Sequence, residues 1–341
     1  MKFDFCIGNP PYQEETKDNG RQNPVYNKFM EEAYKVAGCV EMITPARFLF
    51  NAGQTPKNWN EQMLNDEHFK VLQYEADAAK VFPTTEIKGG VAITIRDKGK
   101  AYGAIRTFIA HEKLKDIVRK VHMMNPDHKC LDSIISSRGC YRTTDIFFED
   151  FPYASDRLGT GTGNMIASNF FEKIPEVYIN NSKSNACYGM LARINNQRTI
   201  CYIEKKYVQD NEFIHRYNVA SPKSNGSGVF GETLTATEIL YPECGATDTF
   251  ISIGSLNTLY EAEVLQKYIK TKLFRALLGV KKVTQDTPKS VWDMIPLQDF
   301  TENSDIDWSK SITEIDCQLY KKYRLSQEEI DFIETNVKEM E

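Results

Sequence analysis

Two consecutive prolines, Pro10 and Pro11, end a short apolar run near the start of the chain. The run, residues 2–8 (KFDFCIG), has the length and the bounding residues of a buried β-strand. Proline cannot donate to a sheet ladder and its ring fixes φ, so the strand has to stop and a stiff turn has to follow. The sequence therefore places Asn9-Pro10-Pro11-Tyr12 on a rigid elbow directly after a strand.

Strand and helix patterns alternate over the first hundred residues. A helix is expected over residues 24–37, with Asn23 as N-cap and Pro24 in its first turn. Further elements are predicted at 39–44, 69–74 and 90–96 as strands and at 57–65 as a helix. This order predicts an α/β fold with a parallel sheet.

The rhythm changes after about residue 97, where short strands lie among many Asn, Ser and Gly residues. A hairpin is predicted around Asn195-Asn196 and a capping box at Ser326 and Glu329. The other predicted elements are helices at 111–124, 260–278, 312–323 and 327–337 and a short strand at 292–296. We expect an α/β domain over residues 1–110, a mixed α+β domain over 111–300 and a helical acidic tail over 301–341.

Composition and charge leave most classes of partner open. The formal net charge is −5, but the acidic excess is concentrated in residues 299–341, so it does not exclude DNA binding elsewhere. The 8 cysteines form no C-x-x-C pair, which predicts reduced thiols and a cytoplasmic protein. No apolar run is long enough for a membrane span, so no membrane partner is expected. His122, His128 and Cys130 lack a fourth ligand, and no metal site is predicted.

The elbow residues suit one chemical task. The Asn9 side-chain oxygen and the Pro10 carbonyl can together accept both hydrogens of an amine on a planar ring, and Tyr12 offers a flat face for stacking. The lone pair of such an amine is delocalised into the ring, which makes it a poor nucleophile. Two acceptors aimed at its hydrogens favour a more tetrahedral nitrogen in the transition state and free the lone pair for attack on a methyl donor.

Residues 3–12 (FDFCIGNPPY) resemble motif IV of the DNA N6-adenine methyltransferases, in the NPPY, gamma-like class. The resemblance implies a Rossmann-like catalytic domain that uses S-adenosyl-L-methionine, a flipped adenine and a separate target-recognition domain. It gives Asn9, Pro10 and Tyr12 catalytic roles and makes Pro11 and Tyr12 substrate-binding. The fold class expected is thus α/β, a partial Rossmann-like methyltransferase sheet followed by a mixed α+β target-recognition domain.

The resemblance extends through residues 42–49 and 81–97. In many relatives an aromatic residue from this later region covers the flipped base, but the strand here contains Ile93-Thr94-Ile95-Arg96. Either Phe82, which we include in the substrate-binding set, or another residue substitutes for this aromatic, or the adenine is held from one side only. Beyond residue 97 the chain resembles, less specifically, the recognition half of the fused type IIG restriction-modification methyltransferases.

The resemblance also implies a glycine-rich cofactor loop, which in that branch of the family precedes motif IV by many residues. A different family order puts this loop later, but the loop at residues 159–164 (GTGTGN) follows no buried strand, and we interpret it as a surface loop. The main S-adenosyl-L-methionine motif is therefore not visible. We expect the chain to be the C-terminal part or a split half of an enzyme, with an N-terminal methyltransferase or nuclease portion, fused or separate.

Two segments are candidates for contact with double-stranded DNA. Lys267, Lys270 and Arg275 can share a flank of the helix predicted over 260–278, and Lys223 and Asn225 lie in a small, polar loop. A solvated helix face and a plain linker are the alternatives.

The sequence predicts a site-specific DNA adenine-N6 methyltransferase of a restriction-modification system. One alternative is a catalytically silent DNA-specificity module that needs a partner chain. Another keeps the chemistry on RNA or on a glutamine side chain.

Overall fold

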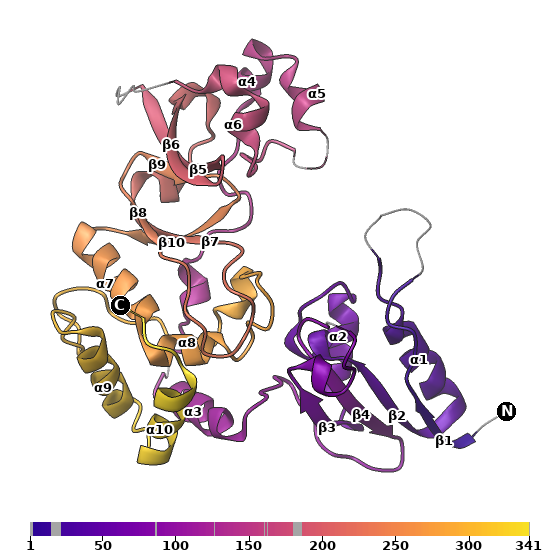
Figure 1. Cartoon of the computed structure of the whole chain (residues 1–341). Coiled ribbons are helices and arrows are strands. Elements are labelled where there is room, and N and C mark those ends of the chain that lie inside the picture. The colour runs from indigo at the N-terminus through magenta and orange to yellow at the C-terminus, as the bar shows by residue number, and fades with distance from the viewer. Residues whose placement is uncertain are drawn as a thin grey trace. The chain divides into compact units, whose positions relative to one another are not determined.

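The computed structural model describes residues 3–14, 22–85, 87–125, 127–159, 161, 163–179 and 186–340, and the chain divides into two compact units (Figure 1). Unit 1 comprises Met1–Asp116, Ser227–Phe230 and Gly279–Thr284. Unit 2 comprises Ile117–Gly226, Gly231–Leu278 and Gln285–Glu341.

Unit 1 is an α/β unit built on one four-stranded sheet, which confirms the predicted fold class for this part of the chain. Its elements are β1 (Phe3–Gly8), α1 (Tyr26–Val36), β2 (Ala37–Pro45), η1 (Ala46–Phe50), α2 (Lys57–Asn65), β3 (Phe69–Glu75), η2 (Ala78–Lys80) and β4 (Val91–Asp97).

The sheet of unit 1 is mixed, so the prediction of a parallel sheet was wrong. Its order is β1-β2-β4-β3, and β1 runs parallel to β2, with Gly8 opposite Met42. β4 pairs antiparallel with both β2 and β3. Between β3 and β4 the described residues hold only the short turn η2 and no α-helix, so β4 returns beside β3 in the opposite direction.

Helix α1 starts later than its sequence pattern predicts. Its N-cap is Val25, whose side chain makes no capping bond, rather than Asn23. The preceding residues are used by the elbow: the Val25 N–H donates to the carbonyl of Tyr12 (3.1 Å), and Pro24 bridges Gln13. Pairing with the elbow thus replaces the first turn of the predicted helix.

One face of the sheet carries the core of unit 1. Met30 of α1 and Trp59 of α2 are buried in the same cluster as Val40 of β2 and Phe69 of β3. Helices α1 and α2 therefore cover the same side of the sheet (Figure 1).

The opposite face of the sheet exposes apolar side chains on β1. Phe3, Phe5 and Ile7 of β1 have exposed fractions of 51%, 72% and 79%. Ile43 and Ile93 pair opposite each other on the same face and are only half-buried. Sheets with parallel strands are ordinarily covered on both faces, so this open face is unusual for an α/β unit.

Unit 2 holds the remaining elements, except that α3 (Glu112–Met123) begins in unit 1. Its strands are β5 (Cys187–Ile194), β6 (Gln197–Glu204), β7 (Tyr217–Pro222), β8 (Glu238–Leu240), β9 (Cys244–Ala246) and β10 (Phe250–Leu256). Its α-helices are α4 (Asp145–Asp150), α5 (Ala154–Leu158), α6 (Phe170–Lys173), α7 (Leu259–Lys270), α8 (Lys272–Leu278), α9 (Ile312–Lys322) and α10 (Gln327–Asn336). The short 3-10 turns are η3 (Leu131–Ile134), η4 (Pro175–Val177), η5 (Lys205–Tyr207), η6 (Glu212–His215) and η7 (Lys289–Val291).

The strands of unit 2 form two three-stranded sheets, β10-β7-β8 and β6-β5-β9. The hairpin between β5 and β6 turns at Asn195 and Asn196, both at positive φ, as predicted. The predicted strand at 292–296 is wrong: apart from one isolated bridge at Pro296, this segment is irregular, and Trp292 is buried as packing.

The predicted helix over 260–278 is two helices. α7 ends and α8 begins around Thr271, whose backbone is extended. The Thr271 hydroxyl donates to the carbonyl of Tyr268, and the Asp316 carboxylate accepts the N–H groups of Lys272 and Leu273. A carboxylate at the N-terminus of α8 satisfies amides that a continuous helix would have bonded internally.

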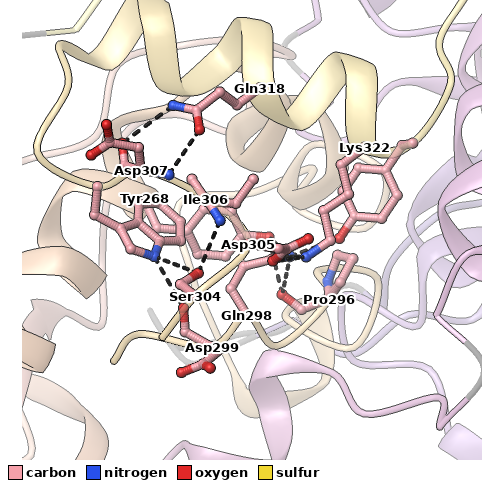
Figure 2. Close-up of polar contacts among 12 residues, drawn as sticks. Tyr268, Pro296, Gln298, Asp299, Ser304, Asp305, Ile306, Asp307, Gln318 and Lys322 are labelled. Atoms are coloured by element: carbon pink, nitrogen blue, oxygen red, sulfur yellow. Dashed lines mark hydrogen bonds and ion pairs between the residues drawn. The ribbon is translucent and has the colours of Figure 1, made fainter. Parts of the chain in front are cut away.

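The C-terminal segment packs within unit 2 through a buried polar network (Figure 2). The Gln298 amide donates to the hydroxyls of Tyr268 (3.2 Å) and Tyr323 (2.7 Å) and accepts from Lys322 (2.9 Å). The Trp308 indole donates to the Ser304 hydroxyl. The predicted capping box of Ser326 and Glu329 is present at the start of α10. None of the described helices combines the length and the apolar character needed to cross a membrane.

Candidate functional site

The elbow lies at the carboxyl end of β1, where the parallel pair β1–β2 ends. Asn9 is exposed, and its amide makes no hydrogen bond to any other described residue. No described donor is bonded to the carbonyl of half-buried Pro10 either. Both acceptors assigned from the sequence thus lack a described partner, and Pro11 beside them is exposed.

Tyr12 folds back from the elbow onto the core of unit 1. Its ring contacts Phe82 edge to face, with centroids 6.4 Å apart and planes at 73°. Its hydroxyl is buried and finds no partner among the described residues. Burial raises the pKa of this phenol above its ordinary value, which keeps the hydroxyl uncharged. The structure therefore brings together Tyr12 and Phe82, which lie seventy positions apart in the sequence.

The two rings form a corner and not a pair of parallel walls. An edge-to-face contact leaves no slot between Tyr12 and Phe82 for a planar base. A base stacked on one ring would meet the other at its edge. Of the two arrangements that the sequence left open, this geometry favours stacking on one face.

The segment that carries Phe82 is fixed to the end of β2. Gly90 has a φ of +75°, and a Cβ there would lie 2.2 Å from the carbonyl oxygen of Glu75. The Ala46 N–H donates to the carbonyl of Gly90 (3.0 Å), and the Arg47 guanidinium donates to the carbonyl of Lys88. Glycine is required where two backbone segments approach this closely. No role is predicted for Arg47 from the sequence, and its guanidinium ties this loop to the end of β2.

The basic residues predicted on one helix flank are largely engaged within unit 2. The Lys267 ammonium donates to the carbonyl of Trp308 (2.8 Å). Arg275 is 3% exposed and donates to the carbonyls of Lys270 and Glu232. A buried guanidinium cannot reach a phosphate in this conformation, so the sequence interpretation of Arg275 is revised to a structural one. Lys270 is half-buried.

The two residues predicted to contact DNA from the polar loop after β7 differ in exposure. Asn225 is 2% exposed, and its side-chain oxygen accepts the N–H of Thr235 (2.7 Å), which removes it from the surface and revises its predicted DNA contact. Lys223 keeps partial exposure and forms an ion pair with Asp248 (2.8 Å). Among the five predicted DNA-contacting residues, Lys223 is the one that lines a cavity of about 150 Å³.

The glycine-rich loop after residue 158 does not follow a strand. It follows the short helix α5, and a Cβ on Gly159, Gly161 or Gly163 would meet no atom within 4 Å. Thr160 and Thr162 lie outside the described residues. A phosphate- or nucleoside-binding loop normally joins a buried strand to a helix with its glycines in close contact, and these glycines lack that setting.

Comparisons with known proteins point to one class for the first unit. The model of the Eco57I restriction-modification methylase family matches residues 1–82. A curated protein of Mycoplasma pneumoniae, described as an uncharacterized adenine-specific methylase, is 30% identical over 99 residues. That alignment covers 28% of this chain and 24% of the relative. The resemblance to restriction-modification methyltransferases expected from the sequence is confirmed.

A solved structure also matches over most of the chain. The type IIG restriction endonuclease BpuSI covers 94% of this chain and 50% of its own chain, with 10% identity and a TM-score of 0.33. A similarity of that size is too low to bear on fold or function. The chain spans about a quarter of the curated relative and half of this structure.

Proposed function

We propose that this chain supplies the adenine-holding part of a site-specific DNA adenine-N6 methyltransferase of a restriction-modification system. The observation that carries the proposal is the elbow itself. Asn9 and Pro10 present two oxygens without described partners at the end of a strand, beside the aromatic corner of Tyr12 and Phe82. Ligands of open α/β sheets bind outside the carboxyl ends of the strands, which is where this elbow lies.

The roles of the elbow residues follow from the two acceptors. The Asn9 side-chain oxygen and the Pro10 carbonyl each accept one hydrogen of the adenine amine. These bonds strengthen as the nitrogen becomes tetrahedral and cationic, so they stabilise the transition state more than the ground state. After methyl transfer the amine loses one proton to water, which requires no base from this chain.

The rings of Tyr12 and Phe82 bind the flipped base in this proposal. Adenine inside a duplex cannot reach a methyl donor, so it has to leave the stack, which costs a few kcal/mol. Stacking on the Tyr12 face contributes about 1–3 kcal/mol and offsets much of that cost. Phe82 supports the Tyr12 ring and closes the side of the corner.

The methyl donor itself is assigned to residues outside the described part of this chain. S-adenosyl-L-methionine would supply an electrophilic methyl group next to the elbow. The described residues offer no glycine-rich turn between a strand and a helix, so they do not form its main binding site. The described residues act, in this proposal, on the amine and the base.

The exposed apolar face of the sheet is an argument for a further protein portion that covers it and completes the fold. Phe3, Phe5 and Ile7 expose their side chains on β1, which is also an unpaired edge of the sheet. Burying each of them would contribute about 1.5–3 kcal/mol. We therefore place an N-terminal methyltransferase portion, fused or separate, against β1 and this face.

A catalytically silent DNA-specificity module is the second candidate, and the lack of a described cofactor loop favours it for the isolated chain. One experiment separates the methyltransferase part from the silent module. The chain, alone or with its cofactor-binding portion, is incubated with labelled S-adenosyl-L-methionine and with DNA, RNA or a glutamine peptide. We expect label in N6-methyladenine of duplex DNA only when both portions are present. DNA binding in a gel shift without any product supports the silent module, and label in RNA or glutamine overturns the proposed substrate.

A further inference from the structure

Three basic side chains from distant parts of the sequence meet in the 150 Å³ cavity of unit 2. Arg138 follows η3, Lys223 follows β7 and Lys289 begins η7. The carboxylate of Asp248 in the turn between β9 and β10 holds two of them, with Lys223 at 2.8 Å and Arg138 at 3.5 Å.

The arrangement is held firmly by backbone bonds. The Lys223 N–H donates to the carbonyl of Thr249 (2.9 Å), and the Thr287 N–H donates to the carbonyl of Lys223 (2.9 Å). The Asp248 N–H donates to the carbonyl of Ile166 (3.0 Å). The Asp248 side chain is only 12% exposed, so it orients its partners from the buried wall of the cavity.

The cavity keeps an excess of positive charge. Asp248 is the single carboxylate that lines it, against Arg138, Lys223 and Lys289. The thiol of Cys140 also lines it, but burial raises the pKa of this thiol to about 11, so it adds no negative charge near neutral pH. Two positive charges thus remain uncompensated among the lining residues.

Arg138 is the group best placed to meet a ligand. Its side chain is 73% exposed, although its Nε is directed to Asp248. That orientation leaves the two terminal nitrogens of the guanidinium fork for a second acceptor, and such a fork matches two oxygens of one phosphate. Lys289 is exposed on the same rim, where its ammonium donates to the carbonyl of Ile135 (3.1 Å).

We propose that Arg138, Lys223 and Lys289 bind a backbone phosphate of duplex DNA at this cavity, with Asp248 as the positioning residue of Arg138 and Lys223. This proposal rests on the proposed function for its choice of DNA over free phosphate. Lys223 and Lys289 already bond within unit 2, as Lys267 on the predicted helix flank does, so Arg138, with a side chain 73% exposed, makes the main contact. A phosphate contact fixes the register of the duplex and does not read its sequence.

The test is the salt dependence of DNA binding by the full chain. Affinity for a labelled duplex is measured over a series of salt concentrations for the wild type, Arg138→Ala and Arg138→Glu. Arg157→Ala is the matched control, because Arg157 also pairs with a carboxylate (2.8 Å to Glu176) and is 47% exposed but lies outside the cavity. Competition with inorganic phosphate, at constant ionic strength, distinguishes a DNA site from a free-phosphate site.

We expect Arg138→Ala to weaken binding by about tenfold and to make the negative slope of log affinity against log salt shallower by about 0.9. Arg138→Glu should weaken binding further, and Arg157→Ala should match the wild type. Equal slopes for wild type and both Arg138 variants would overturn the proposal and leave the methyltransferase assignment standing. Absence of DNA binding by the wild type, or displacement of DNA by phosphate at micromolar concentration, would also overturn it. Failure of the proposed function is recognised separately, by the absence of N6-methyladenine.

Discussion

The ring of Tyr12 meets the ring of Phe82 edge to face, 6.4 Å between centroids, at the exit of β1. This contact joins the elbow to the loop before β4, and it leaves the Tyr12 hydroxyl buried without a described partner. In the proposed function, the ring of Tyr12, and not its hydroxyl, is therefore the part that stacks on the flipped base.

Substitutions at Tyr12 should separate the ring from the hydroxyl. Tyr12→Phe removes a buried oxygen that has no described partner, so we expect methylation close to that of the wild type. Tyr12→Ala removes the stacking face and should lower kcat/KM about 10- to 100-fold. Steady-state methylation by the chain with its cofactor-binding portion measures both; equal loss in the two variants would contradict stacking as the role of Tyr12.

The open face of the sheet should make the isolated chain associate with itself. Phe5 and Ile7 are 72% and 79% exposed on the edge strand β1, and contiguous exposed apolar groups promote association. We expect the sedimentation coefficient of the wild type to rise with protein concentration. The double variant Phe5→Ser, Ile7→Ser should keep the sedimentation coefficient of a monomer at every concentration. Met123→Ser, at an apolar residue 75% exposed on α3, is the control. A wild type that remains monomeric throughout would argue against a covering layer on this face.

Gly90 should tolerate no side chain. A Cβ would lie 2.2 Å from the Glu75 carbonyl oxygen, and Glu75 cannot withdraw because it pairs with Val91. Gly103 has a similar φ of +88° with nothing within 4 Å, so Gly103→Ala isolates the cost of the backbone conformation, about 1–2 kcal/mol. Urea unfolding should show a substantially larger loss for Gly90→Ala. Equal losses would mean that the close approach is not rigid.

Asp316 should make unit 2 less stable as pH rises. Burial raises the pKa of its carboxyl from 3.8 to about 6, nearby Glu334 also raises it, and bonds from the Leu273 and Lys272 amides lower it. Because the folded pKa lies above the unfolded one, the contribution is fully present below about pH 4 and is lost as pH rises through about 6.

The variant Asp316→Asn removes this titration and keeps one acceptor for α8. Relative to that variant, the wild type should gain on the order of 1 kcal/mol of unfolding free energy between pH 7.5 and pH 5. Denaturant unfolding at the two pH values measures the difference. An unchanged difference would show that Asp316 is not buried as a carboxyl in the folded protein.

The sequence predicts a local feature well where only a few residue types can adopt the required conformation or make the required bond. The Asn195-Asn196 turn and the Ser326 capping box are predicted correctly because positive φ and N-cap bonding each favour few residues. The direction of β4 could not be predicted, because strand polarity depends on the connection and not on the strand's own residues.

Features that depend on distant partners were not visible in the sequence either. The helix over 260–278 divides because Asp316, far along the chain, caps α8. The burial of Arg275 and Asn225 has the same origin, since their partners lie in other segments. Arg138 and Asp248 carried no signal, because nothing in the spacing of the sequence shows that they share a cavity with Lys223.

The central claim is that the Asn9 side chain holds the adenine amine for methylation, and one product assay tests it. Asn9→Ala and the control Asn58→Ala, at an exposed residue of α2, are combined with the cofactor-binding portion and with duplex DNA. Mass spectrometry of the digested DNA then measures N6-methyladenine, and a gel shift measures binding. We predict that Asn9→Ala loses about 100-fold or more of the product while its DNA binding matches that of Asn58→Ala. Equal amounts of N6-methyladenine from the two variants would contradict the assignment.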